Sequence, residues 1–153
     1  MADGMVTLLG NLNIDRELFE SVASEFELTV DQAPTLGALR EMCGSRDVAA
    51  VLFDARNLGL SWNDALESVL RSAPRALPIV YAGFAESIPW PELAEAGAFH
   101  VLRRPIKESE ARHTLGFVWA AKRWDTLQKK TAARQGQSEN SREPAVSRFA
   151  AKG

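Results

Sequence analysis

The stretch AAVLFDAR, Ala49 to Arg56, places an unbroken apolar run directly before a single aspartate, Asp54. Such a run, without polar alternation, is typical of a strand that is buried on both faces of a sheet. The sequence therefore predicts a central strand that delivers one carboxylate to the edge of the sheet. Two interpretations of Asp54 stay open: a chemical role, or hydrogen bonding to the loop that follows it.

On both sides of this strand, short apolar runs alternate with segments of helical periodicity. Candidate helix boundaries are Asn13 or Asp15, Ser61, Gly44 and Gly97. The predicted strands cover residues 5–12, 27–30, 48–53, 77–83 and 99–105. The predicted helices cover residues 15–26, 34–43, 61–72, 89–97 and 108 to at least 128.

Strands separated by helices favour a parallel sheet with helices on both faces, because crossovers between parallel strands are almost always right-handed. The predicted fold class is therefore α/β, a doubly wound, flavodoxin-like (βα)5 sheet. In such sheets functional groups gather at the carboxyl ends of the strands, which is where Asp54 lies.

The charge divides the chain into two parts. Residues 129–153 contain six Lys/Arg and two Asp/Glu, a charge of +4, which leaves −6 on residues 1–128. We interpret 1–128 as one domain and 129–153 as a basic, flexible linker. Nucleic-acid binding by this linker is not favoured, because its basic residues are sparse and its aromatic content is Phe149 alone.

Other compositional features limit the setting of the protein. No apolar run approaches the roughly 20 residues of a membrane span, and no signal peptide is evident, so the cytoplasm is the expected location. The single cysteine, Cys43, is interpreted as core filler rather than as a nucleophile.

Three features, spread over about residues 5–128, resemble response-regulator receiver domains. Asp54 closes the third predicted strand, where receivers keep their phospho-acceptor. LPIVYAGF, residues 77–84, resembles the fourth strand of the family, and EAGAFHVLRRPI, residues 95–106, resembles the stretch through its fifth strand. The resemblance implies receiver topology and a regulatory role in two-component signalling, phosphorelay or transcription.

The site residues that the resemblance implies are largely replaced. Receivers hold Mg²⁺ with an acidic pair after the first strand, where this chain has Gly10 and Asn11, or Asn11 and Asn13 in a shifted register. Mg²⁺ prefers anionic oxygens, and neutral amides do not offset the cost of its dehydration. The sequence therefore predicts no metal and no cofactor at this site.

Further replacements point the same way. The hydroxyl that contacts a phosphoryl group falls at Ala82-Gly83, which lack one, and the family's lysine is Arg104. Arg56 stands two residues after Asp54, where its guanidinium could reach the space of a metal. Our hypothesis is a degenerate receiver in which Asp54 pairs with Arg56 or Arg104. The alternative is a working phospho-acceptor at Asp54, which would need Mg²⁺.

Enzymatic activity is not expected. The chain has no Gly-rich dinucleotide fingerprint after the first predicted strand and no Gly-x-Ser-x-Gly elbow. His100 lacks neighbours at metal-ligand spacing, and His113, on the last predicted helix, is expected to face solvent. We therefore assign no catalytic residue.

The last predicted helix carries two apolar stripes, more than one sheet face needs. One interpretation is ordinary core packing. The other is a homodimer surface that continues into a short coiled coil. The candidate interface residues are Phe117, Trp119, Trp124 and Leu127.

The order of receiver-like domain, long helix and SREPAVSRF (residues 141–149) resembles the N-terminal region of sigma-54-dependent activators, and in particular of flagellar master regulators. In that family an AAA+ ATPase and a helix-turn-helix domain follow. The resemblance therefore implies that the chain is a fragment, with other domains or a regulatory protein as partners.

Overall fold

The computed structural model describes residues 4–12 and 15–128, and its centre is a five-stranded parallel sheet with the strand order β2-β1-β3-β4-β5. This order confirms the predicted doubly wound α/β fold. The strands are β1 (Met5–Leu9), β2 (Thr29–Ala33), β3 (Val48–Phe53), β4 (Leu77–Gly83) and β5 (His100–Arg104).

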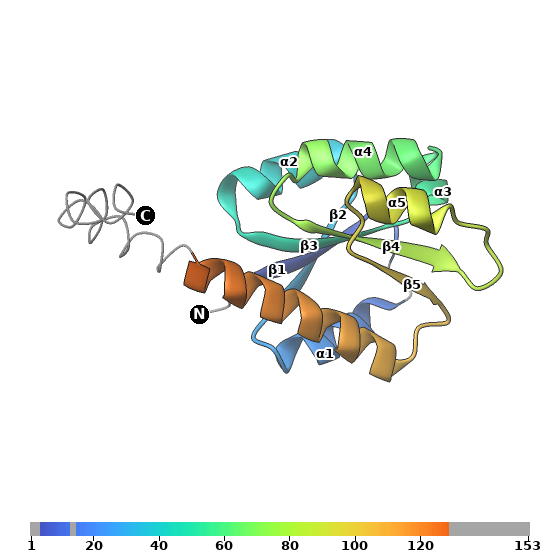
Figure 1. Cartoon of the computed structure of the whole chain (residues 1–153). Coiled ribbons are helices and arrows are strands. Elements are labelled where there is room, and N and C mark those ends of the chain that lie inside the picture. The colour runs from blue at the N-terminus through green and yellow to red at the C-terminus, as the bar shows by residue number, and fades with distance from the viewer. Residues whose placement is uncertain (1–3, 13–14, 129–153) are drawn as a thin grey trace, which may run out of the picture. The chain divides into compact units, whose positions relative to one another are not determined.

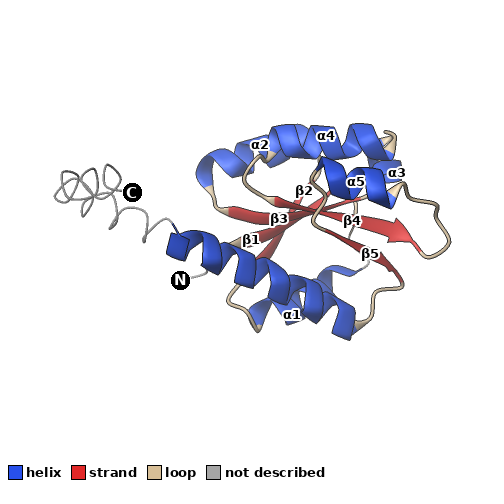
Figure 2. Cartoon of the chain, viewed as in Figure 1, coloured by secondary structure: helices blue, strands red, loops and turns tan. Residues whose placement is uncertain are grey.

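Helices cover both faces of the sheet (Figures 1 and 2). They are α1 (Arg16–Ser24), α2 (Leu36–Ser45), α3 (Ala55–Leu58), α4 (Trp62–Ser72), α5 (Trp90–Ala96) and, up to Trp119, a last helix that runs over residues 108–128. One core cluster joins α2, α4 and α5 to the sheet, and the other joins α1 and the first turns of the last helix to the opposite face.

The central strands are buried as the sequence predicts. Every residue of β3 is buried, and in β4 all five residues between Leu77 and Gly83 are buried. Strands with helices on both faces have no solvent-facing side, so polar alternation is not required of them. Asp54 follows β3 directly and stands at the carboxyl edge between β1 and β4.

Two helix starts follow from capping side chains. Ser61 Oγ accepts a hydrogen bond from the backbone N–H of Asp64 at 3.2 Å, as predicted for this cap. Thr35 Oγ1 accepts from the N–H of Ala38 at 3.1 Å, so α2 begins after Thr35 and not at Pro34.

Several predicted boundaries are wrong. Gly44 does not end α2, which continues to Ser45. The strand predicted at 27–30 lies at Thr29–Ala33, because Glu27 has a φ of 59° and belongs to the turn after α1. The four-residue α3 is absent from the sequence-based prediction.

The chain divides into two compact units, residues 1–119 and 120–153. The predicted boundary at 128/129 stays a prediction, and the predicted linker 129–153, like Asn13, lies outside the described residues. Among the described helices, none has the length and apolarity that crossing a membrane requires.

Candidate functional site

Asp54 is a buried carboxylate with two different partners. Its side chain is 5% exposed. Asp54 Oδ1 accepts a hydrogen bond from the backbone N–H of Arg56 at 2.9 Å, which caps α3. Asp54 Oδ2 accepts from Arg104 Nη2 at 2.9 Å, which forms an ion pair. Of the two arginines that the sequence offers as partners, Arg104 therefore supplies the guanidinium and Arg56 supplies only its backbone.

Tyr81 connects this ion pair to the start of α1. The guanidinium carbon of Arg104 lies 4.9 Å from the centre of the Tyr81 ring, within the range of a cation–π contact. The Tyr81 hydroxyl donates a hydrogen bond to Asp15 Oδ2. Burial, followed by the neighbouring Asp15 carboxylate, raises the pKa of Tyr81 above its ordinary value, so Tyr81 stays a neutral donor.

Sequence reasoning missed the contact between Tyr81 and Asp15. Asp15 is predicted as a possible helix cap, and it does stand at the cap position of α1, but its side chain makes no capping hydrogen bond. Its carboxylate faces a tyrosine that is 66 positions away in the sequence. The only available signal is the tyrosine within an otherwise aliphatic strand, whose hydroxyl needs a partner once it is buried.

The loop after β1 is held by amide side chains. Asn57 Nδ2 donates to Asn11 O at 3.2 Å, and Asn57 Oδ1 accepts from the Asn11 N–H at 3.2 Å. Gln32 Nε2 donates to Gly10 O at 2.7 Å. Gly10 has a φ of +86°, and a Cβ there would lie 2.7 Å from Asn57 Oδ1, so both the backbone and the packing favour glycine.

These residues do not fit the Mg²⁺ that receivers hold at this edge. Gly10 and Asn11, directly after β1, are neutral, and the Asp54 carboxylate already binds a guanidinium. Within residues 4–12 and 15–128, no three His, Cys, Asp or Glu side chains are grouped to hold a metal ion. A divalent cation would meet the positive charge of Arg104 and would lack the anionic oxygens that repay its dehydration.

Glu86 lies next to the predicted site positions at the end of β4, and the sequence did not indicate it as a site residue. Ala82 is buried, and the Gly83 N–H donates to Glu86 Oε1 at 3.2 Å. Arg56 is 71% exposed, and its Nε lies 3.6 Å from Glu86 Oε2. The Arg56 guanidinium is therefore paired with Glu86 rather than with Asp54.

The candidate interface residues fall into two groups. Trp119 is half-buried, and its ring centre lies 6.3 Å from that of Phe26, so it contributes to the core of the first unit. Phe117, Trp124 and Leu127 are 49%, 64% and 50% exposed. Phe117 also has an intramolecular contact, because its ring centre lies 5.0 Å from that of His113.

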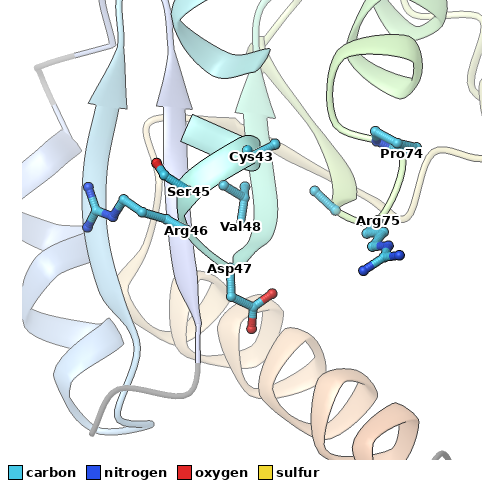
Figure 3. Close-up of a pocket in the computed structure, with 9 residues that line it drawn as sticks. Cys43, Ser45, Arg46, Asp47, Val48, Pro74 and Arg75 are labelled. Atoms are coloured by element: carbon cyan, nitrogen blue, oxygen red, sulfur yellow. The ribbon is translucent and has the colours of Figure 1, made fainter. Parts of the chain in front are cut away.

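A hollow of about 450 Å³ lies at the opposite, amino edge of β3 and β4 (Figure 3). Cys43 lines it, and burial raises the pKa of its thiol, which disfavours the nucleophilic thiolate. Arg46 extends toward β2, where its guanidinium pairs with Asp31 at 2.7 Å. This hollow shares no residue with the carboxyl-edge site.

Comparison with known proteins identifies the fold. The receiver domain of a LuxO repressor from Vibrio parahaemolyticus has a TM-score of 0.66 at 13% identity, over 81% of this chain and 95% of that one. A receiver domain from Clostridium thermocellum has a TM-score of 0.63 at 16% identity, over 79% and 98%. The chain therefore has the receiver-domain fold.

A longer protein, NtrX from Brucella abortus in complex with ADP, has a TM-score of 0.68 at 14% identity. The match covers 89% of this chain but 30% of NtrX. No protein-family model matches the chain, and no curated protein matches it in sequence.

Proposed function

We propose that this chain is a receiver-type signalling domain that acts through protein–protein contact and self-association, without Mg²⁺-dependent phosphorylation of Asp54. The observation that carries the proposal is the 2.9 Å ion pair between Arg104 Nη2 and the buried Asp54 carboxylate. This pair neutralises the carboxylate with a charge from the chain itself.

The donor set supports this proposal. Catalysis of phosphoryl transfer depends mainly on positioning and on neutralising charge at the transferred group. The neutral loop at Gly10 and Asn11 supplies no anionic oxygen for a metal, and the Gly83 N–H is already engaged by Glu86. No group of the chain has a catalytic role in this proposal, and it requires no cofactor.

Self-association is proposed through the exposed aromatic and aliphatic side chains of the last helix. Phe117, Trp124 and Leu127 are three of the five large hydrophobic residues that are exposed within the described part of the chain. Exposed hydrophobic side chains in one helical segment are typical of association surfaces. The proposed assembly is a homodimer.

The similarity to NtrX supports a wider setting. That protein is much longer than the matched region. We propose that the present domain likewise passes a signal to another domain or to a regulatory protein, as in sigma-54-dependent activators. Nucleic-acid and membrane contacts are not part of the proposal.

The decisive experiment adds Mg²⁺ and beryllofluoride, a mimic of the aspartyl phosphate, to the wild type and to Asp54→Ala. Amide chemical shifts and calorimetric heats are recorded for both. We expect no saturable binding and no shift changes near Asp54 in either protein. Saturable Mg²⁺ binding with shifts that vanish in Asp54→Ala would overturn the proposal and support the phospho-acceptor alternative.

Self-association is tested by sedimentation of the wild type, Trp124→Ala and Leu60→Ala. Leu60 is 37% exposed and belongs to the loop between α3 and α4, so its replacement is a matched control. We expect Trp124→Ala to weaken the dimer and Leu60→Ala to leave it unchanged. A monomeric wild type at all concentrations would contradict the dimer.

A further inference from the structure

The loop between β4 and α5 contains a carboxylate that is turned into the protein. Glu86 has a side chain that is 7% exposed, whereas Phe84, two residues earlier, is 79% exposed. A buried carboxylate is costly unless hydrogen-bond donors and positive charge surround it. The donors around Glu86 therefore constitute a site for an anion.

Three groups from separate parts of the chain form this site. The Trp62 Nε1–H, at the start of α4, donates to Glu86 Oε2 at 2.9 Å. The Gly83 N–H, at the end of β4, donates to Oε1 at 3.2 Å. Arg56, on α3, places its Nε 3.6 Å from Oε2. The Trp62 ring is itself fixed against Phe53, with ring centres 5.9 Å apart.

The side chain of Arg103, on β5, binds backbone carbonyl groups of the same loop. Its Nη1 lies within hydrogen-bond distance of three carbonyl oxygens, at 3.2 Å from Gly83, 3.4 Å from Phe84 and 2.8 Å from Glu86. The Glu86 N–H also donates to Gly83 O at 3.2 Å, which closes a tight turn. The loop is therefore fixed both by its inward carboxylate and by the carbonyl groups that accept from Arg103.

The anion site is connected to Asp54 through Arg56. The backbone N–H of Arg56 donates to Asp54 Oδ1, and its guanidinium pairs with Glu86. One residue thus joins the end of β3 to the loop after β4. The Glu86 carboxylate contacts both segments, through the Arg56 guanidinium and the Gly83 N–H.

We propose that Trp62 Nε1, the Gly83 N–H and Arg56 form a carboxylate-binding site that the chain fills with its own Glu86. Glu86 acts as an internal ligand that fixes the β4–α5 loop, and with it the exposed Phe84, independently of any group added to Asp54. This inference deepens the proposed function, because it identifies what holds the loop when Asp54 stays unmodified.

The test is chemical rescue of Glu86→Ala with sodium acetate, whose atoms match those that the substitution removes. NMR follows the indole N–H of Trp62, assigned with Trp62→Phe, and hydrogen exchange follows the Gly83 amide. We expect exchange at Gly83 to rise roughly tenfold or more in Glu86→Ala, since a partly buried hydrogen bond is lost. Saturable acetate binding should return the Trp62 indole signal and the Gly83 exchange rate toward wild type.

Matched controls keep the result specific. Glu95→Ala removes an exposed glutamate of α5 and should change neither signal, with or without acetate. Glu86→Gln keeps the shape and an oxygen acceptor but loses the charge, so it should retain part of the protection if Glu86→Ala does not fold. Sodium chloride at equal ionic strength replaces acetate in a parallel sample.

Two results would overturn the inference: unchanged Trp62 and Gly83 signals in both Glu86 variants, or signals that are altered in a folded Glu86→Ala variant and that acetate does not restore. Neither depends on Mg²⁺ or beryllofluoride. If beryllofluoride binds at Asp54 while acetate rescues Glu86→Ala, the proposed function fails and the carboxylate site remains. If neither ligand binds, the carboxylate site fails alone.

Discussion

Asp54 and Glu86 are two nearly buried carboxylates at the same edge of the sheet, and they are stabilised differently. Each accepts one backbone N–H and faces one arginine. Arg104 is 32% exposed and lies 2.9 Å from Asp54, whereas Arg56 is 71% exposed and lies 3.6 Å from Glu86. Glu86 also accepts a hydrogen bond from the indole N–H of Trp62, which compensates for its more distant and more exposed arginine. Asp54 therefore depends on charge, and Glu86 depends mainly on neutral donors.

The largest expected effect that tests this difference is that of Arg104→Ala. Among the residues that the structure describes, the substitution leaves the buried Asp54 carboxylate with the Arg56 N–H as its remaining hydrogen-bond donor. We expect the free energy of unfolding to fall by about 3 kcal/mol, the low end for a broken buried pair, because water reaches Arg104. Urea denaturation measures the change.

A double variant serves as the control for Arg104→Ala. Asp54→Asn removes the charge that is left unpaired, so Asp54→Asn combined with Arg104→Ala should lose less than the sum of the single losses. Strictly additive losses would show that the two side chains do not stabilise each other, and would remove the basis of the comparison.

The second largest effect concerns Tyr81, whose ring packs against the Arg104 guanidinium. Tyr81→Phe keeps the ring beneath the guanidinium but removes the hydrogen bond to Asp15. A hydrogen bond to a charged acceptor stabilises by about 1.5–3 kcal/mol, and Asp15 is partly solvated, so we expect a loss of about 1.5 kcal/mol. Urea denaturation near neutral pH measures it, and an unchanged midpoint would show that this bond contributes nothing.

Alkaline pH gives an independent measurement of the same contact, because Tyr81 is the only tyrosine. Its pKa is raised in the folded chain, so the stability it contributes is complete below the ordinary value near 10 and is lost as the pH rises above it. We expect tyrosinate absorbance to appear at higher pH in the native chain than in urea. Coincident titrations would contradict the buried, carboxylate-bound hydroxyl.

The same two carboxylates show how far sequence reasoning reaches. Asp54 is predictable because the apolar run Val48–Phe53 leads directly into it and strand order fixes the edge on which it lies. Glu86 has no comparable local signal, since its main partner, Trp62, is 24 positions away. Burial of a loop carboxylate depends on tertiary contacts that periodicity does not encode.

The wrong strand boundary has a different physical reason. β2 is an edge strand, so the half-buried Asp31 and Gln32 are tolerated within it, and a search for apolar runs stops too early.

The sequence likewise does not decide which of two arginines pairs with Asp54. Arg56 is nearer along the chain, but Arg104 lies on β5 and reaches across the edge, which only the folded sheet shows.

The smallest expected effect is that of Arg56→Ala, which removes the charged partner of Glu86. Arg56 is largely solvated, so its attraction to Glu86 is screened, and its removal leaves the Trp62 and Gly83 donors in place. The backbone N–H that Asp54 accepts is also retained in alanine. We expect the free energy of unfolding to change by less than about 1 kcal/mol, and by less still at high salt. A loss as large as that of Arg104→Ala, measured in the same urea series, would mean that Glu86 also depends on charge and that the two carboxylates are stabilised alike.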